Sequence, residues 1–158
     1  MSAPEAQSPS LAPSLDRPLP VFDALQVGDA LPGRDFTPDI VQSFLYNAAL
    51  WNAHRIHYEL DYARDAEGYP GLVLAGPQMG DWMAQCVDDW AREAADLVRI
   101  EYSNRQAAYI GDTVTTGGEI TAIDHATREV TIALFVRNAN GEVLTPGTAV
   151  LRFAEATP

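Results

Sequence analysis

The feature that most limits how this chain can fold is a long helix with one apolar face, followed only by strands. Gly76-Pro77 is typical of a helix start, because a proline fits the first turn without losing a hydrogen bond. Beyond it, apolar residues recur at helical spacing along one stripe: Met79, Trp82, Met83, Cys86, Val87, Trp90, Ala94 and Leu97. The stripe is best explained as core packing, and it needs a sheet to cover it.

After Val98, apolar and polar residues alternate as they do in strands with one buried face. The alternation recurs at residues 98–102, 120–124, 130–136 and 149–153. Breaks are predicted at residues 111–112, 117–118 and 125–128, and at Asn140-Gly141, a strong hairpin dipeptide. We therefore predict an α+β fold in which a curled antiparallel sheet wraps the central helix.

A second helix is predicted upstream, after a short mixed stretch at residues 31–36. Thr37-Pro38 is a favourable start, with the Thr37 hydroxyl as the cap. The helix has one apolar face, which should carry the chain inward to two histidines: Ile40, Val41, Phe44, Leu45, Ala48 and Ala49. Residues 60–66 predict one more short helix, and residues 67–71 predict a turn.

Length and composition indicate a single domain at residues 21–156, preceded by a tail. Residues 1–20 are rich in proline, serine and alanine, and we expect them to be disordered. No apolar run approaches the roughly 18 residues that a membrane span needs. The single cysteine, Cys86, excludes an internal disulfide and fits a reducing cytoplasm, where we expect the protein.

The charge of the chain narrows its possible ligands. A formal net charge of −12 argues against nucleic acid, which binds surfaces with surplus cations. All ten cations are arginine, which excludes a Schiff-base lysine and the phosphate loop that ends in Gly-Lys. Any phosphate bound here would be held by arginine.

Residues 46–76 contain His54 and His57, followed by a loop rich in tyrosine, proline and glycine. Two histidines three positions apart could share a metal, with Glu59 or Asp61 as a third ligand, but the spacing matches no standard zinc pattern. We predict no metal and no cofactor. A buried and inert His57 is the simpler alternative.

The run NAHRIHYELDYARDAEGYPGLVLAGP, residues 52–77, resembles a family signature. It is similar to MaoC-like (R)-enoyl-thioester hydratases and dehydratases of the hot-dog fold. The likeness is to the branch with mesaconyl-C4-CoA and itaconyl-CoA hydratases and mitochondrial 3-hydroxyacyl-thioester dehydratases. That branch typically has Asn-x-His-Arg-Ile-His-Tyr-Asp, a Glu-Gly-Tyr-Pro turn and His-Gly-Pro. Residues 109–114 also resemble its Pro-Gly-Asp-Thr segment, so the likeness covers residues 28–153.

The resemblance implies roles for individual residues. The broader family has an aspartate five positions before its catalytic histidine, which puts Asn52 at the aspartate position and His57 at the histidine. An amide can orient water but has no basicity, so His57 would be the working acid and base, or His54 would share the task. Gly76, at the helix start, would offer a backbone N–H to the enolate oxygen. Ala75 replaces the usual histidine of His-Gly.

The implied reaction adds water to, or removes it from, the 2,3 double bond of an enoyl thioester carried by CoA or a carrier protein. We assign substrate contacts to Arg55, Tyr69, Pro77, Arg99 and Arg105, with a structural tie to Glu59 or Asp61 favoured for Arg55. The family implies a homodimer or heterodimer of hot-dog domains. The charge and the lack of a long apolar run lead us to expect no nucleic acid and no membrane as partners. Two alternatives remain: a non-catalytic or half-catalytic subunit of a heteromeric hydratase, and a thioesterase using Glu59 or Asp61.

Overall fold

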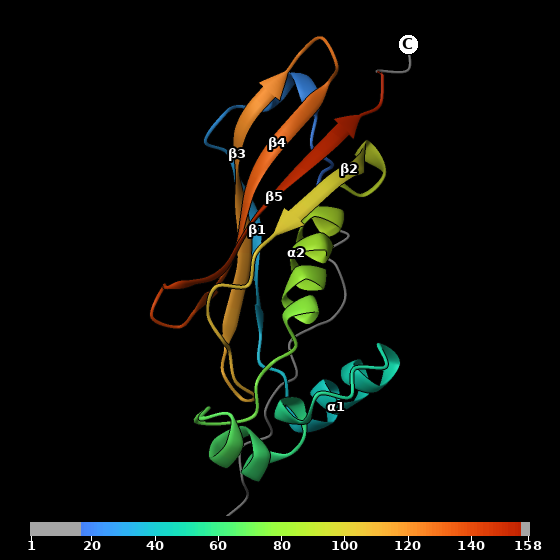
Figure 1. The fold of residues 1–158 in the computed structure, drawn as a ribbon. Coiled ribbons are helices and arrows are strands. Elements are labelled where there is room, and N and C mark those ends of the chain that lie inside the picture. Colours follow the sequence, from blue (N-terminus) through green and yellow to red (C-terminus); the bar gives the residue numbers. More distant parts are fainter. Residues whose placement is uncertain (1–16, 156–158) are drawn as a thin grey trace, which may run out of the picture.

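The computed structural model describes residues 17–155, and its centre is one five-stranded antiparallel sheet. The strands are β1 (Ala30–Phe36), β2 (Ala95–Tyr102), β3 (Val114–Asp124), β4 (Glu129–Asn138) and β5 (Val143–Phe153). Their spatial order is β1-β3-β4-β5-β2, so that β1 and β2 form the two edges of the described sheet (Figure 1). Residues 1–16, most of the tail predicted to be disordered, lie outside the described residues.

Strands β3, β4 and β5 form a meander joined by two hairpins at predicted turns. Between β3 and β4, the Asp124 carboxylate accepts backbone N–H groups of Ala126 and Thr127, which closes the turn. Between β4 and β5, Gly141 adopts a φ of 84°, a conformation that glycine adopts without steric cost. The predicted Asn140-Gly141 turn is therefore confirmed.

The predicted break at Gly117-Gly118 is wrong, because both glycines lie inside β3. A side chain at Gly117 would meet the ring of Phe135 at 2.6 Å, and one at Gly118 would meet Leu134 at 2.8 Å. These glycines thus let large side chains of β4 lie across β3. Strand β1, which the sequence left as a short mixed stretch, pairs with β3 along the same region.

Helix α2 (Gly76–Ala91) lies along one face of the curled sheet, as Figure 1 shows. The predicted start is confirmed, and most of the predicted stripe is buried, with Met79, Met83 and Val87 at 2% exposed or less. The helix ends earlier than predicted, since a 3-10 turn (Arg92–Ala94) follows and Leu97 lies on β2, 44% exposed. The predicted fold, a curled antiparallel sheet around a central helix, is confirmed.

Helix α1 (Ile40–Ala49) begins after a different cap from the one predicted. Asp39, not Thr37, is the N-cap, because its carboxylate accepts the Gln42 N–H while the Gln42 side chain accepts the Asp39 N–H. The orientation of the helix is also unexpected. The buried residues are the polar Ser43 and Asn47, whereas the apolar residues are exposed: Ile40, Val41, Phe44 and Leu45.

The chain between α1 and α2 lies beneath the N-terminal end of α2 (Figure 1). It contains a 3-10 turn (Arg55–His57) and a π-helical turn (Tyr62–Ala66), the latter inside the predicted short helix at residues 60–66. The hydroxyl of Tyr46 on α1 donates to the Asp81 carboxylate on α2 at 2.6 Å, which ties the two helices together. No helix among residues 17–155 is both long enough and apolar enough to cross a membrane.

Candidate active site

His57 is buried, 7% exposed, at the end of the 3-10 turn. Its Nδ1 lies 2.7 Å from the carbonyl oxygen of Val73. The Val73 N–H in turn donates to the Ile56 carbonyl at 3.0 Å. Two hydrogen bonds therefore hold the histidine turn against the segment that leads into α2, with Val73 three residues before Gly76.

Burial is the main reason why the pKa of His57 lies below its ordinary value. The hydrogen bond to the Val73 carbonyl opposes that change, and the nearby His54 adds to it. A lowered pKa keeps the imidazole neutral at neutral pH. With Nδ1 used by Val73, Nε2 is the nitrogen left to accept a proton.

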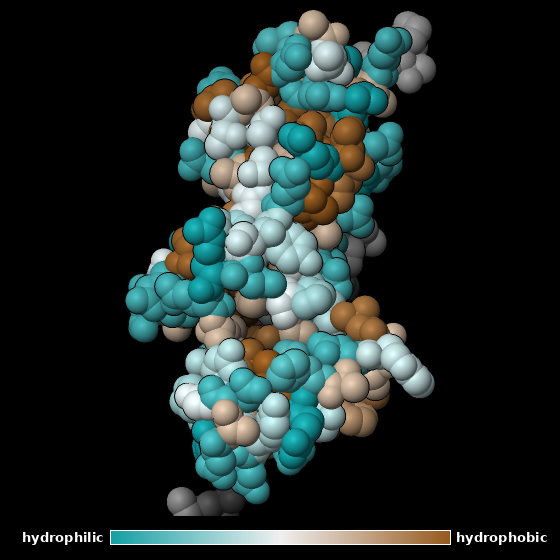
Figure 2. Space-filling view, viewed as in Figure 1, coloured by the Kyte–Doolittle hydropathy of each residue, from teal (hydrophilic) through white to brown (hydrophobic). Residues whose placement is uncertain are grey.

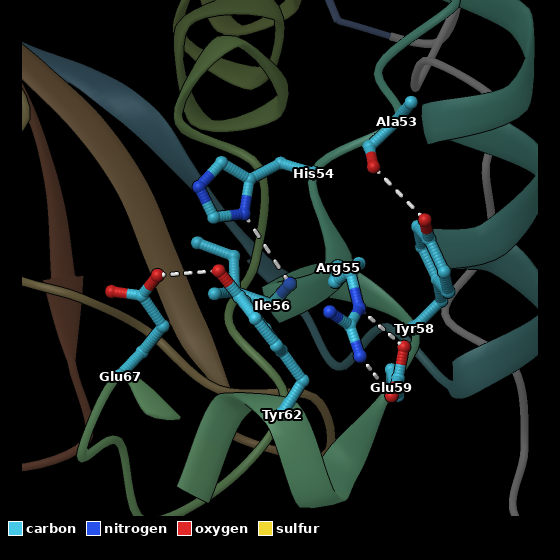
Figure 3. Close-up of polar contacts among 8 residues, drawn as sticks. All are labelled: Ala53, His54, Arg55, Ile56, Tyr58, Glu59, Tyr62 and Glu67. Carbon is cyan, nitrogen blue, oxygen red and sulfur yellow. Dashed lines mark hydrogen bonds and ion pairs between the residues drawn. The ribbon is translucent and has the colours of Figure 1, made fainter. Parts of the chain in front are cut away.

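His54 is exposed, and its ring centroid lies 6.0 Å from that of His57. Its Nδ1 accepts the backbone N–H of Ile56 at 3.4 Å, which makes His54 the N-cap of the 3-10 turn. The Tyr62 ring lies 6.4 Å from the His54 ring. Figure 3 shows this side of the site, with one His54 nitrogen toward Ile56 and the other pointing away.

Both polar atoms of the Asn52 side chain are hydrogen-bonded to nearby residues of the chain. Its Nδ2 donates to the Asn47 Oδ1 at 2.9 Å, and its Oδ1 accepts the His54 N–H at 3.2 Å. The Nδ2 of Asn47 donates to the Ser43 carbonyl at 2.8 Å. A chain of hydrogen bonds thus runs from α1 to the backbone of His54. Asn47 could not have been singled out from the sequence, where it reads as one polar residue of a helix.

Gly76 begins α2, and the preceding Ala75 makes no side-chain cap. Pro77 has no N–H and the Gln78 N–H donates to the Ala75 carbonyl at 3.0 Å, which leaves the Gly76 N–H as the first-turn amide available among the described residues. A Cβ on Gly76 would overlap the Asn104 Nδ2. The Asn104 Oδ1 accepts the hydroxyl of the buried Thr145 at 3.0 Å, which holds the amide over the glycine. The sequence offered no signal for Asn104, which comes from a loop distant in the chain.

The predicted substrate residues lie on different segments of the chain, and each has its own contacts. Arg55 makes the tie to Glu59 that was favoured, with contacts of 2.6 and 2.7 Å, and its guanidinium lies 4.0 Å from the Tyr62 ring centroid. Tyr69 is half-buried, with its ring 6.5 Å from that of Tyr109. Pro77 is exposed next to Gly76. Arg99 is exposed on β2, and Arg105 is exposed after the end of β2.

Other titratable residues lie apart from this site. Among residues 17–155, no group of three histidine, cysteine or acidic side chains could hold a metal ion. Cys86 is buried in the core, as expected from its place on the helix stripe. His125 is exposed in the β3–β4 turn, with its ring against that of Phe22.

Comparison with solved structures identifies the fold as a hot-dog fold. An (R)-hydratase from A. caviae involved in PHA biosynthesis is 16% identical, with a TM-score of 0.74 over 83% of this chain and 98% of that chain. A chain of the ChsH1-ChsH2 complex from Mycobacterium tuberculosis is 24% identical, with a TM-score of 0.72 over 82% of this chain and 98% of that one.

Residues 24–110 match the family hydroxyacyl-thioester dehydratase type 2, and the chain belongs to that family. Over 73 residues, 46% of this chain, it is 42% identical to mesaconyl-C(4)-CoA hydratase from Chloroflexus aurantiacus. Over 42 residues, 27% of this chain, it is 50% identical to the mitochondrial hydroxyacyl-thioester dehydratase type 2 of Schizosaccharomyces pombe. The matched parts are 24% and 14% of those proteins. The family inferred from the sequence is confirmed.

Proposed function

We propose that this protein adds water to, or removes water from, the 2,3 double bond of an enoyl thioester. The observation that carries the proposal is the buried His57, bonded to a carbonyl three residues before the helix that begins at Gly76. Family membership supports the reaction class, and this juxtaposition supports an acid-base role for His57 and an oxyanion role for Gly76.

The reaction can be written with these two groups. In hydration, the His57 Nε2 takes a proton from water while the water oxygen bonds to C3. The electron pair of the double bond moves toward C2 and the thioester oxygen, which becomes an enolate stabilised by the Gly76 N–H at the positive end of α2. His57 then returns its proton to C2. Asn52, an amide without basicity, holds the loop and takes no proton.

The thioester would be carried by CoA or a carrier protein. We assign the carrier phosphates to the exposed Arg99 and Arg105, since the Arg55 guanidinium is occupied by Glu59. Tyr69 and Pro77 would border the acyl group near Gly76. A cytoplasmic location stays a prediction that rests on the single cysteine.

Purified protein mixed with crotonyl-CoA tests the proposal through loss of the enoyl-thioester absorbance. We expect turnover by the unchanged protein and a loss of kcat/KM of at least about 100-fold in His57→Gln, the usual scale for a proton-transfer residue. His125→Gln is the matched control, because His125 lies exposed in a turn, and it should retain activity. Equal activity in His57→Gln and the control would exclude His57 as the acid-base group.

A second candidate is one half of a heteromeric hydratase. Support comes from the apolar side chains left exposed on edge strand β2, Leu97 and Val98, and from the exposed apolar face of α1. We propose that a further hot-dog domain, a second copy or an unlike chain, covers these surfaces. Inactivity of the purified chain that is relieved by a co-purified hot-dog protein would favour the unlike chain.

The thioesterase alternative has weaker support. The carboxylate of Glu59 is held by both ends of the Arg55 fork, which lowers its pKa and its availability as a base. Release of free thiol from acyl-CoA substrates, measured with a thiol reagent, would nevertheless favour this alternative over hydration.

A further inference from the structure

We infer that backbone groups hold His54 and His57 in opposite neutral tautomers, so that His57 carries the proton and His54 donates a hydrogen bond to the oxygen that adds to C3. The tautomers follow from the structure alone. The role of His54 in the reaction rests on the proposed function.

For His57, the partner of Nδ1 is the carbonyl oxygen of Val73, which can only accept a hydrogen bond. Nδ1 must therefore carry the proton. In a neutral ring this leaves Nε2 with a lone pair, as a proton acceptor requires.

For His54, the partner of Nδ1 is the backbone N–H of Ile56, which can only donate. Nδ1 must therefore be unprotonated, and in the neutral ring the proton lies on Nε2. Figure 3 shows the other ring nitrogen pointing away from Ile56, so this N–H is not used by the 3-10 turn. Asn52, which accepts the His54 N–H, fixes the backbone on which the ring stands.

The two rings consequently offer one acceptor and one donor at a centroid separation of 6.0 Å. A water molecule with hydrogen bonds of about 2.8 Å to two nitrogens at a roughly tetrahedral angle holds those nitrogens about 4.6 Å apart. Ring nitrogens lie about 1.2 Å from their centroids, so rings 6.0 Å apart can place two nitrogens at that distance. Such a water accepts from the His54 Nε2–H and donates to the His57 Nε2. One hydrogen of the water then faces the base, and its remaining lone pair can attack C3.

His54 keeps its proton throughout. Losing Nε2–H would leave an imidazolate, and accepting a proton at Nε2 would first require a tautomer that breaks the bond to Ile56. The O–H bond of water breaks toward His57, the C3–O bond forms, and the same proton passes from His57 to C2, so the steps sum to addition of one water. In dehydration, the His54 N–H stabilises the departing hydroxyl oxygen.

Nitrogen NMR of the protein with labelled histidine tests the tautomers without any substrate. At neutral pH we expect a protonated Nδ1 on His57 and a protonated Nε2 on His54. Their signals are told apart from those of the third histidine, His125, by their disappearance in His57→Gln and His54→Asn respectively. The same tautomer in both rings, or the reverse assignment, would overturn the inference. This result does not depend on whether the protein turns over enoyl thioesters.

Kinetics of three variants separate hydrogen-bond donation from helix capping. Asn and Asp can both accept the Ile56 N–H as His54 does, but only Asn can also donate. On the high-pH plateau, we expect His54→Asn to keep kcat within about tenfold of the unchanged protein, and His54→Asp and His54→Ala to fall about 100-fold, as when an oxyanion donor is lost. Equal activity in the Asn and Asp variants would reduce His54 to a cap and overturn the donor role.

The pH dependence of kcat/KM gives a further check, because the charged and titratable groups around His54 and His57 can be named. His57 faces His54, and His54 faces Tyr62, whose hydroxyl donates to Glu67 and whose ring lies under Arg55. The acid limb of kcat/KM should persist in His54→Asn, because it reports protonation of His57. Loss of that limb would assign the proton to His54. Absence of turnover in the unchanged protein, with opposite tautomers by NMR, would reject the proposed function and leave the tautomers standing.

Discussion

At the scale of single residues, the amide at position 52 is matched to the amide at position 47. The Ser43 carbonyl accepts from Asn47, which turns the Asn47 Oδ1 toward Asn52. The His54 N–H donates at the other end, which turns the Asn52 Oδ1 toward it. This chain of hydrogen bonds has a backbone acceptor at one end, the Ser43 carbonyl, and a backbone donor at the other, the His54 N–H. Each side-chain amide can therefore take only one orientation. A carboxylate at position 52 would face an oxygen of Asn47.

Asn52→Asp is therefore expected to lose activity, although related enzymes are expected to carry aspartate there. It should lower the free energy of unfolding by about 1–3 kcal/mol, the cost of unpaired buried polar groups, as measured by urea denaturation. Asn140→Asp makes the same change in an exposed turn and should stay within about 0.5 kcal/mol. Full stability and activity of Asn52→Asp would show that Asn47 accommodates either side chain.

The lowered pKa of His57 predicts how stability depends on pH. Burial disfavours the charged ring in the folded state, so the unfolded chain binds more protons below its ordinary pKa of about 6.5. Above that pH, His57 is neutral in both states and does not reduce the free energy of unfolding. As pH falls from there toward the folded pKa, the free energy of unfolding declines. Between about pH 7.5 and 5.5, the unchanged protein should thus lose more unfolding free energy than His57→Gln. At pH 5.5, one unit below the ordinary pKa, the difference can reach at most about 1.4 kcal/mol. An equal loss in both proteins would contradict a lowered pKa.

The sequence identified the residues that differ chemically from their neighbours, but not their partners. His54, His57 and Gly76 stood out by type and spacing, and a tie from Arg55 to Glu59 or Asp61 was expected. Asn47, Asn104 and the Val73 carbonyl contact these residues because of tertiary packing. No local pattern marks such partners, since a backbone carbonyl is present at every position.

At the scale of secondary structure elements, the sequence predicted α2 and the meander well because their burial agrees with their periodicity. The prediction from sequence was wrong where the residues that the fold buries are not the ones that their polarity would suggest. Helix α1 has the apolar stripe of an amphipathic helix, but the domain buries its polar side, at Ser43 and Asn47. The glycine pair in β3 reads as a turn, but it is a place where β4 side chains need room.

Gly118→Ala tests that explanation. The added methyl group would lie 2.8 Å from Leu134, 2.9 Å from Ile132 and 3.0 Å from the Ala133 carbonyl oxygen, so the core must shift. We expect a loss of about 1–3 kcal/mol of unfolding free energy by urea denaturation, despite the poor strand propensity of glycine. Gly71→Ala is the control, because its methyl group would meet only atoms 3.9 Å away, and it should change stability by less than about 1 kcal/mol. If Gly118→Ala leaves the free energy of unfolding unchanged, the glycines are not needed to make room for the side chains of β4.

At the scale of the whole molecule, most of the exposed large apolar side chains of the described residues lie in two places. One is edge strand β2, with Leu97, Val98 and Tyr102, and the other is α1 with the residues after it, including Trp51, 92% exposed. In Figure 2, hydrophobic atoms reach the surface beside β2 and around α1. An apolar edge strand with unpaired backbone groups pairs readily with another chain. With a net charge of −12 and no lysine, the α1 surface is poorly suited to an anionic membrane and better suited to protein.

We therefore expect the purified protein to form a dimer through β2, measured by sedimentation or light scattering over a range of concentrations. Val98→Lys should shift it to monomer, because a lysine at the edge would lie buried and unpaired at the interface. Val143→Lys is the matched control: Val143 is 44% exposed, compared with 47% for Val98, but it pairs with Arg137 of β4 and lies beyond the β2 pairing, which ends at Gly147. If Trp51→Ser also weakens the dimer, the same partner covers α1, whereas a dimer insensitive to Val98→Lys would place the interface elsewhere. A monomer at every concentration would point to an unlike partner, because the exposed β2 and α1 surfaces would still need a cover.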